Sequence, residues 1–158
     1  MELHEYAQYD GLGLAQLVST GQVCPSEFAS CAVRATEQVD GTLGAVVEVY
    51  GERAAGVGDD APSGPFGGVP TMVKDLFHGE AGQHCGNGSR LSADWVVSLD
   101  TAFYDRIRRS GLVNLGRTTT SEFGILGTTE TLAEGLTCTP WSAAHSAGVE
   151  ATRTPASA

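Results

Sequence analysis

The chain has 158 residues, of which 41% are hydrophobic and 18% are charged, a balance typical of packed globular proteins rather than disordered ones. Its length suits a single domain with a sizeable core. Nineteen acidic residues against nine basic ones give a net charge of −10, which repels phosphate backbones and anionic lipid surfaces. Nucleic acids and membranes are therefore poor candidates as partners.

The four cysteines are scattered along the chain, without Cys-x-x-Cys pairs or a nearby regular histidine spacing. This pattern argues against a zinc site and predicts ordinary buried thiols. No apolar run approaches the roughly 20 residues of a membrane span, and the opening residues, MELHEYAQYDG, have neither the basic nor the apolar region of an export signal. The sequence predicts a cytoplasmic protein without metal, cofactor or membrane association.

Two helices are predicted within the first 40 residues. Apolar residues recur at loosely helical spacing over residues 10–18, and Gly21 follows as a suitable C-terminal cap. A second helix is predicted to begin at Pro25, because proline is favoured in the first turn and Glu27 can reach back to a free backbone donor. Its apolar face continues to Val39.

A strand, a loop and a second strand are predicted next. Residues 43–50, LGAVVEVY, are rich in β-branched and aromatic side chains and too short for a helix, which favours a strand. Residues 51–68 are rich in Gly, Ala, Asp, Pro and Ser, which favours a short helix followed by an exposed loop. Residues 69–74 alternate between two sets that are both largely apolar, as in a strand covered on both faces.

A third helix is predicted to begin at Asp100 as its N-cap. Three arginines lie in its last turns and Gly111 follows, an arrangement that the helix dipole favours. Residues 112–116, LVNLG, predict the next strand. Helices that alternate with short apolar strands indicate an α/β fold with a largely buried sheet.

Lys74 is the only lysine in the chain and lies in the apolar segment GGVPTMVKDLF at residues 67–77. The excess of arginine over lysine indicates a codon bias, so rarity alone means little. An ammonium group inside an apolar strand loses hydration, which lowers its pKa from ~10.4 and permits a neutral amine that acts as a base. Asp75 is not the expected counter-ion, because neighbours on a strand point to opposite faces. Two alternatives stay open: a functional lysine, or a strand-end lysine that extends to solvent.

Three segments resemble the amidase signature family of amide hydrolases: GPFGGVPTMVKDLF at residues 64–77, GLVNLGRTTTSEFGILGTTET at 111–131 and CTPW at 138–141. They occur in the order and at about the separation of that family, and the resemblance covers nearly the whole chain up to about Gly148. It implies that residues 1–148 form the N-terminal portion of an α/β/α sandwich with a mixed sheet. It also implies an amidase that cleaves carbon–nitrogen bonds of small amide substrates.

The resemblance further implies a catalytic triad of a lysine, a bridging serine with a cis peptide bond and a nucleophilic serine. Lys74 matches the lysine of this triad. In the implied mechanism the neutral lysine takes the proton of the bridging serine, which deprotonates the nucleophile that attacks the amide carbonyl. Water then cleaves the acyl-enzyme.

The serine-rich run that carries the bridging serine in this family is missing after CTPW, and Glu150 stands at that position. Two explanations stay open: a frame shift near Gly148, or a deletion that joins on the family's nucleophile segment with Ala151 in place of the nucleophile. Residues 149–158 are therefore predicted to be a divergent, disordered tail. The chain is predicted to be a truncated amidase that is inactive by itself.

Two rival functions are a non-catalytic binding or assembly module, and one half of a split amidase whose serines come from a second polypeptide. Ser121 is predicted to cap a short helix rather than to attack a substrate. The histidines have no evident serine or aspartate partner and are predicted to lie at the surface or in loops: His4, His78, His84 and His145.

Overall fold

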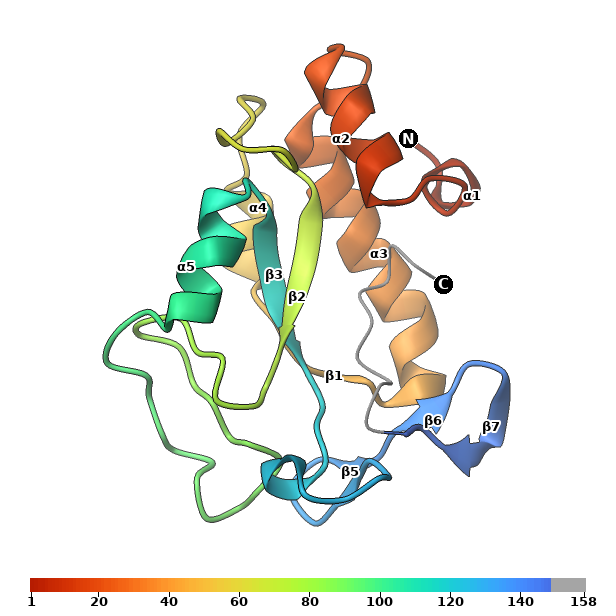
Figure 1. The fold of residues 1–158 in the computed structure, drawn as a ribbon. Helices are drawn as coiled ribbons and strands as arrows, with labels where there is room; N and C mark the ends of the chain where they lie inside the picture. The colour runs from red at the N-terminus through yellow and green to blue at the C-terminus, as the bar shows by residue number, and fades with distance from the viewer. Residues whose placement is uncertain (149–158) are drawn as a thin grey trace.

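The computed structural model describes residues 1–148 (Figure 1). The predicted tail at 149–158, with Glu150 and Ala151, lies outside the described residues. Helices occupy most of the first 43 positions, and a small mixed sheet follows with its connecting segments. None of the helices in the described part of the chain is long and apolar enough to cross a membrane.

The N-terminal helices are α1 (Leu3–Tyr6), α2 (Gly11–Ser19) and α3 (Pro25–Leu43). Asp10 caps α2 by accepting a hydrogen bond from the backbone N–H of Gly13 at 2.8 Å. In the first turn of α3, the Glu27 carboxylate accepts a hydrogen bond from the N–H of Cys24 at 3.2 Å, as the capping pattern predicts. Both predicted helices are confirmed, whereas α1 was not predicted.

The predicted strand at 43–50 is real but begins later. Leu43 is the last residue of α3, and Gly44, with φ +57°, ends the helix in the left-handed conformation. The Asp40 carboxylate then accepts hydrogen bonds from the next two backbone N–H groups, at 2.6 and 2.9 Å. Strand β1 therefore spans only Val46–Val49. The prediction placed the start of the strand too early, because it was based on the content of β-branched residues, which does not show where the preceding helix is capped.

The central sheet joins β1 to β2 (Pro70–Lys74) and β3 (Val113–Thr118) in the order β1-β3-β2. β3 pairs parallel with β2 and antiparallel with β1, so the sheet is mixed. The short helix α4 (Gly51–Ala55) lies between β1 and β2, followed by an exposed loop, as predicted. The predicted strand at 112–116 is confirmed, although β3 continues to Thr118.

Helix α5 (Ala102–Arg109) lies between the two parallel strands in the sequence and supplies their crossover connection. Its N-cap is Thr101, whose hydroxyl accepts a hydrogen bond from the N–H of Tyr104 at 3.2 Å. The prediction of Asp100 as the cap was wrong by one residue, because that carboxylate accepts from the N–H of Ala81 at 2.9 Å instead.

Helices cover both faces of the parallel pair, with α5 on one side and α2 and α3 on the other (Figure 1). The buried core on this side is formed by α2, α3 and the sheet, and it includes Leu14, Phe28, Cys31, Val69 and Leu115. The α/β class and the mixed sheet are thus confirmed.

The segment after β3 forms small elements, of which the sequence predicted only the short helical turn after Ser121. These are the 3₁₀ turn η1 (Glu122–Gly124) and two short hairpins, which pair β4 (Glu130–Thr131) with β5 (Gly135–Leu136) and β6 (Cys138–Thr139) with β7 (Ser142–Ser146). They lie beyond the carboxyl ends of β2 and β3 (Figure 1).

Candidate active site

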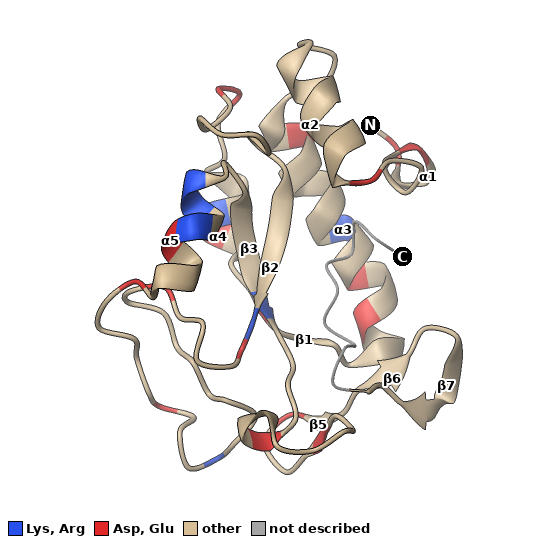
Figure 2. Ribbon diagram, viewed as in Figure 1, with Lys and Arg blue, Asp and Glu red and all other residues tan. Residues whose placement is uncertain are grey.

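Lys74 is the last residue of β2, so its amine lies at the carboxyl end of the parallel pair, where α/β sheets bind ligands. The other four residues of β2 are buried and Lys74 is half-buried. Burial lowers the pKa of the Lys74 amine from its ordinary value. Figure 2 shows β2 and β3 without charged residues except at these ends. The buried strand predicted from the sequence is therefore confirmed, with its lysine at the rim.

Asp75 and Arg117 form a buried ion pair directly behind Lys74. The Asp75 carboxylate lies 3.1 Å from Nη1 of Arg117, and these side chains are 1% and 15% exposed. Both oxygens of Asp75 also accept from the N–H of Gly86, at 2.9 and 3.0 Å. Nε of Arg117 lies 3.0 Å from the carboxylate of Glu48 on β1. The Asp75 carboxylate thus forms its ion pair with Arg117. This agrees with the prediction that Asp75 is not the counter-ion of Lys74.

The backbone turns sharply after Lys74 and is held by specific hydrogen bonds. The N–H of Leu76 donates to the carbonyl of Lys74 at 2.8 Å, and the N–H of Phe77 donates to Oδ1 of Asn87 at 2.9 Å. The N–H of Phe123 donates to the Asn87 carbonyl at 2.8 Å. This network fixes the position of the loop that follows the lysine.

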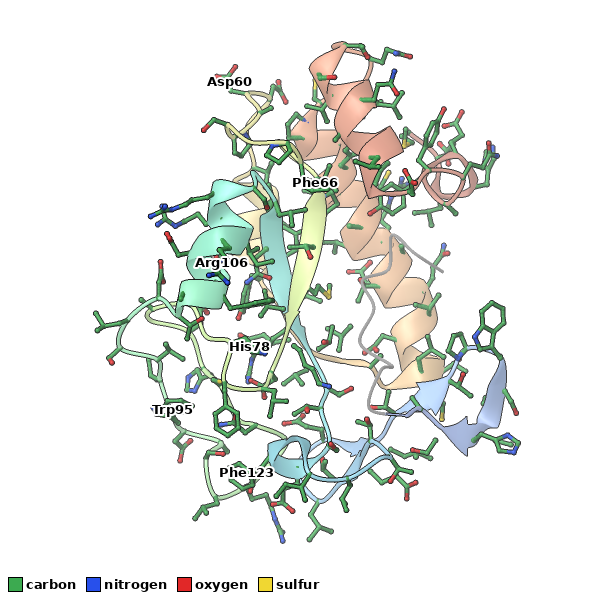
Figure 3. The ribbon with its side chains drawn as sticks, viewed as in Figure 1. Asp60, Phe66, His78, Trp95, Arg106 and Phe123 are labelled. Atoms are coloured by element: carbon green, nitrogen blue, oxygen red, sulfur yellow. The ribbon has the colours of Figure 1, made fainter. Side chains whose placement is uncertain are left out.

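Phe77, Asn87 and Phe123 are the three non-glycine residues with positive φ in residues 1–148, at +54°, +52° and +49°. The rings of Phe77 and Phe123 stack with their centroids 6.4 Å apart. Figure 3 shows Phe123 in the segment below the carboxyl ends of the strands. Left-handed backbone at non-glycine residues is costly and tends to gather at functional sites. The strained positions in the described part of the chain therefore converge on the loops next to Lys74.

A second ion pair anchors the loop after β2. Arg53 of α4 binds the Glu80 carboxylate through two contacts, at 2.7 and 2.9 Å. The side-chain amide of Asn114 on β3 donates to the same carboxylate at 3.4 Å. The bidentate geometry ties the loop to β3 and α4.

A cavity of about 10 Å³ at this end of the sheet is lined by Lys74, Asp75, Glu80, His84 and Arg117, among others. Such a volume holds about one water molecule. Pockets for small molecules usually measure several hundred Å³. Among the described residues, the cavity beside Lys74 is therefore too small for a small-molecule ligand.

Ser121 stands at the N-cap position of η1, where it was predicted, but it makes no capping hydrogen bond. Its Oγ is buried and has no hydrogen-bond partner in the part of the chain that the structure describes. The predicted position is thus confirmed, whereas the capping role is wrong.

The histidines lie at the surface or in loops, as predicted. His78 is half-buried in the loop after β2 and packs against the ring of Phe103 at a centroid distance of 4.4 Å. Figure 3 shows His78 between α5 and the end of β2. The expectation that no histidine has a serine partner was wrong for His145, whose Nδ1 lies 2.8 Å from Oγ of Ser142. This pair is exposed on the β6–β7 hairpin and has the i,i+3 spacing of a local turn contact.

The cysteines are free thiols: Cys31 and Cys85 are buried, whereas Cys24 and Cys138 are half-buried. The prediction of buried thiols is confirmed for the first two only. Among the described residues, no group of three His, Cys, Asp or Glu side chains is arranged to hold a metal ion.

Substitution of Lys74 with methionine is expected to stabilise the fold at neutral pH. Because burial lowers the folded-state pKa, the unfolded chain binds more protons between that pKa and ~10.4, so stability rises with pH across this window. Methionine removes that dependence. Urea unfolding at several pH values is expected to give a stability gap over the wild type at pH 7 that narrows towards pH 10.5. A constant gap would contradict the assigned burial.

These features describe an incomplete α/β fold with a lysine at the carboxyl end of its parallel strands. The family described as Amidase matches residues 28–149, which is more than half of the chain. The 6-aminohexanoate-cyclic-dimer hydrolase of Paenarthrobacter ureafaciens is 33% identical over 142 residues, covering 88% of this chain and 28% of that protein. A glutamyl-tRNA(Gln) amidotransferase subunit of Salinispora tropica is 39% identical over 102 residues, covering 65% of this chain and 20% of that protein. The chain belongs to the amidase family.

Solved structures agree with this assignment. The structure of 6-aminohexanoate cyclic dimer hydrolase complexed with substrate matches with a TM-score of 0.81 and 32% identity, over 92% of this chain and 30% of that chain. Fatty acid amide hydrolase shares the fold, with a TM-score of 0.82 at 15% identity, over 96% of this chain and 28% of that chain. The chain thus spans less than a third of the length of these relatives. The resemblance to amidase signature enzymes is confirmed.

Proposed function

We propose that this chain supplies the lysine-bearing portion of an amide hydrolase, with Lys74 as the base. The observation that carries the proposal is a half-buried amine of lowered pKa at the carboxyl end of β2. Burial favours the neutral amine, which can accept a proton near neutral pH. Membership of the amidase family, whose hydrolase relatives act on amides, supports this role.

In the proposed reaction the neutral Lys74 amine accepts the proton of a bridging serine hydroxyl. That serine takes the proton of a second serine, whose oxygen bonds to the amide carbonyl carbon. Collapse of the tetrahedral intermediate breaks the carbon–nitrogen bond, and the amine leaves with a proton returned along the same path. Water then gives up a proton through the same relay and bonds to the acyl carbon, the bond to the serine oxygen breaks, and that oxygen regains the proton as the carboxylic acid leaves. Neither serine is matched by a residue within positions 1–148.

The proposal therefore includes a second source for the two serines, either further sequence of a longer chain or a second polypeptide. Relatives that are named as subunits of an amidotransferase support the second form. The substrate class proposed for the completed protein is a small amide. The free thiols fit a reducing compartment, so the proposed location is the cytoplasm.

A non-catalytic binding or assembly role is the second candidate. Large apolar side chains are strongly exposed beyond β3, including Leu132 at 83% and Trp141 at 88%. Exposed apolar groups of this size favour contact with another protein segment. Under this alternative the lysine-bearing strand is kept for packing only.

A chimera tests the catalytic proposal. Residues 1–148 are joined to the remaining part of the 6-aminohexanoate-cyclic-dimer hydrolase, and hydrolysis of the cyclic dimer is followed by amine release. We expect the chimera to hydrolyse this amide, and the 158-residue chain alone to do so no faster than its Lys74→Met variant. A folded chimera without activity favours the assembly role. Lys74-dependent turnover by the chain alone would show that no second source is needed.

A further inference from the structure

Thr118 is the last residue of β3 and the direct neighbour of Lys74 across the parallel strands. Residues paired in register on adjacent strands carry their side chains on the same face of a sheet. The preceding pair, Val73 with Arg117, occupies the opposite face, and the Asp75–Arg117 contact agrees with this alternation. The hydroxyl of Thr118 and the amine of Lys74 therefore share one face at the carboxyl end of the sheet.

The Thr118 hydroxyl is an unusual group in this fold. The residue is only 5% exposed, and its Oγ1 has no hydrogen-bond partner among residues 1–148. Within residues 1–148, the hydroxyls of Thr118 and Ser121 are the only buried side-chain nitrogen or oxygen atoms without a hydrogen-bond partner. By contrast, Thr119 bonds to the hydroxyl of Thr137 at 2.8 Å and Thr120 donates to the carbonyl of Ser121 at 3.1 Å.

Buried polar groups without a partner are rare and call for a specific explanation, such as a catalytic role. The two hydroxyls belong to one stretch of four residues that begins next to the lysine. A structural role in capping does not account for either, because Ser121 makes no capping bond and Thr118 lies within a strand. The position beside Lys74 offers Thr118 a donor that changes with the protonation state.

We propose that Thr118 is a positioning residue for Lys74, whose hydroxyl oxygen accepts a hydrogen bond from the ammonium group formed when the lysine takes up a proton. An ammonium group has three N–H donors and no acceptor, and a flexible stem lets it reach a neighbouring oxygen. Such contacts often form only during the reaction. This role rests on the proposed function of Lys74 as a base.

Several charged groups lie around this end of the sheet. Asp75 and Glu48 are each bound to Arg117 on the opposite face. Glu80 lines the same small cavity as Lys74 and is bound to Arg53. Burial raises the pKa of the Glu134 carboxyl, and the nearby Asp75 raises it further. Asp40, at the end of α3, is occupied by the backbone N–H groups of Ala45 and Val46. A hydroxyl stabilises the ammonium weakly enough for the proton to be returned.

The test is a titration of the 158-residue chain, in which a labelled lysine gives a single NMR signal because Lys74 is the only one. Thr118→Val keeps the β-branched shape but removes the acceptor, so we expect the Lys74 midpoint to fall by about one pH unit. Thr118→Ser keeps a hydroxyl and is expected to restore the wild-type midpoint. Thr71→Val is the matched control, because Thr71 is buried in β2 on the opposite face and its loss should not move the midpoint.

A folded Thr118→Val protein with an unchanged Lys74 midpoint overturns the proposal, as does a Thr71→Val protein with an equal fall. If the valine variant does not fold, Thr118→Ala takes its place and the same two outcomes decide. The midpoint is measured without turnover, so an inactive chimera would count against the proposed function without affecting this result.

Discussion

Replacing Lys74 with methionine in the chimera is expected to lower kcat/KM by about three orders of magnitude, the contribution typical of a positioned general base. Methionine has nearly the length and volume of the lysine stem, and the half-buried site tolerates an apolar group. The loss should therefore appear in turnover rather than in folding. Amine release from the cyclic dimer, with circular dichroism as the check on folding, measures both.

The substitution Lys74→Arg distinguishes a role of Lys74 in proton transfer from a role that needs only its positive charge. A guanidinium keeps the positive charge but cannot be deprotonated in a protein, so Lys74→Arg is expected to be as inactive as Lys74→Met. Arg106→Met removes a positive charge from an exposed position on α5 and should leave turnover unchanged. If Lys74→Arg keeps most of the activity, the residue acts through its charge and is not the base.

The lysine-bearing strand could be predicted because its pattern is local. Residues 69–74 are apolar at both alternating sets, which occurs when a strand is covered on both faces. The structure buries residues 69–73 and leaves Lys74 half-buried at the end of the strand. The same alternation excluded Asp75 as the partner of Lys74, and the Arg117 contact confirms this. These inferences needed only the two-residue period of a strand.

The identity of the residues that surround Lys74 could not be predicted, because it depends on register. The pairing of β2 with β3 shifts between Thr71 and Val73, so β3 carries one additional residue there. A shift of one residue in the pairing turns every following side chain of a strand to the other face. Without the additional residue Lys74 would pair with Arg117, whereas with it Lys74 pairs with Thr118 and shares its face. Gly116 was the signal in the sequence that could have indicated this irregularity, because glycine inside a strand often marks a bulge or a close backbone approach. A Cβ at this position would collide with the carbonyl oxygen of Glu48.

The predicted start of α5 was wrong because two neighbouring residues can each act as the N-cap of the helix. Asp100 and Thr101 are both good N-caps, and the choice between them is made by the N–H of Ala81, which is 19 residues away and binds Asp100. The start of β1 was likewise decided by Asp40 and Gly44 at the end of α3. Such competition is settled by tertiary contacts, which composition does not contain.

Replacing Arg117 with methionine is expected to destabilise the fold by about 3 kcal/mol, because it leaves the buried carboxylate of Asp75 without its positively charged partner. The Asp75 side chain is 1% exposed and would lose its cation, keeping neutral hydrogen-bond donors such as the N–H of Gly86. Glu48 would lose its contact as well, although its 44% exposure limits that loss. Urea unfolding measures the change in stability, and hydrogen exchange at the Gly86 amide reports the opening of this end of the sheet directly.

Two controls separate the buried charge from the general effect of losing an arginine. Arg108 pairs with Asp105 at 2.6 Å but is 61% exposed, so Arg108→Met is expected to change stability by less than about 0.5 kcal/mol. In the double variant Asp75→Asn with Arg117→Met, the amide can still accept from Gly86 and no buried charge is left unpaired, so most of the stability should return. A double variant as unstable as Arg117→Met alone would mean that the arginine acts through its packing. In that case the turn after Lys74 is held by contacts other than the Asp75 ion pair.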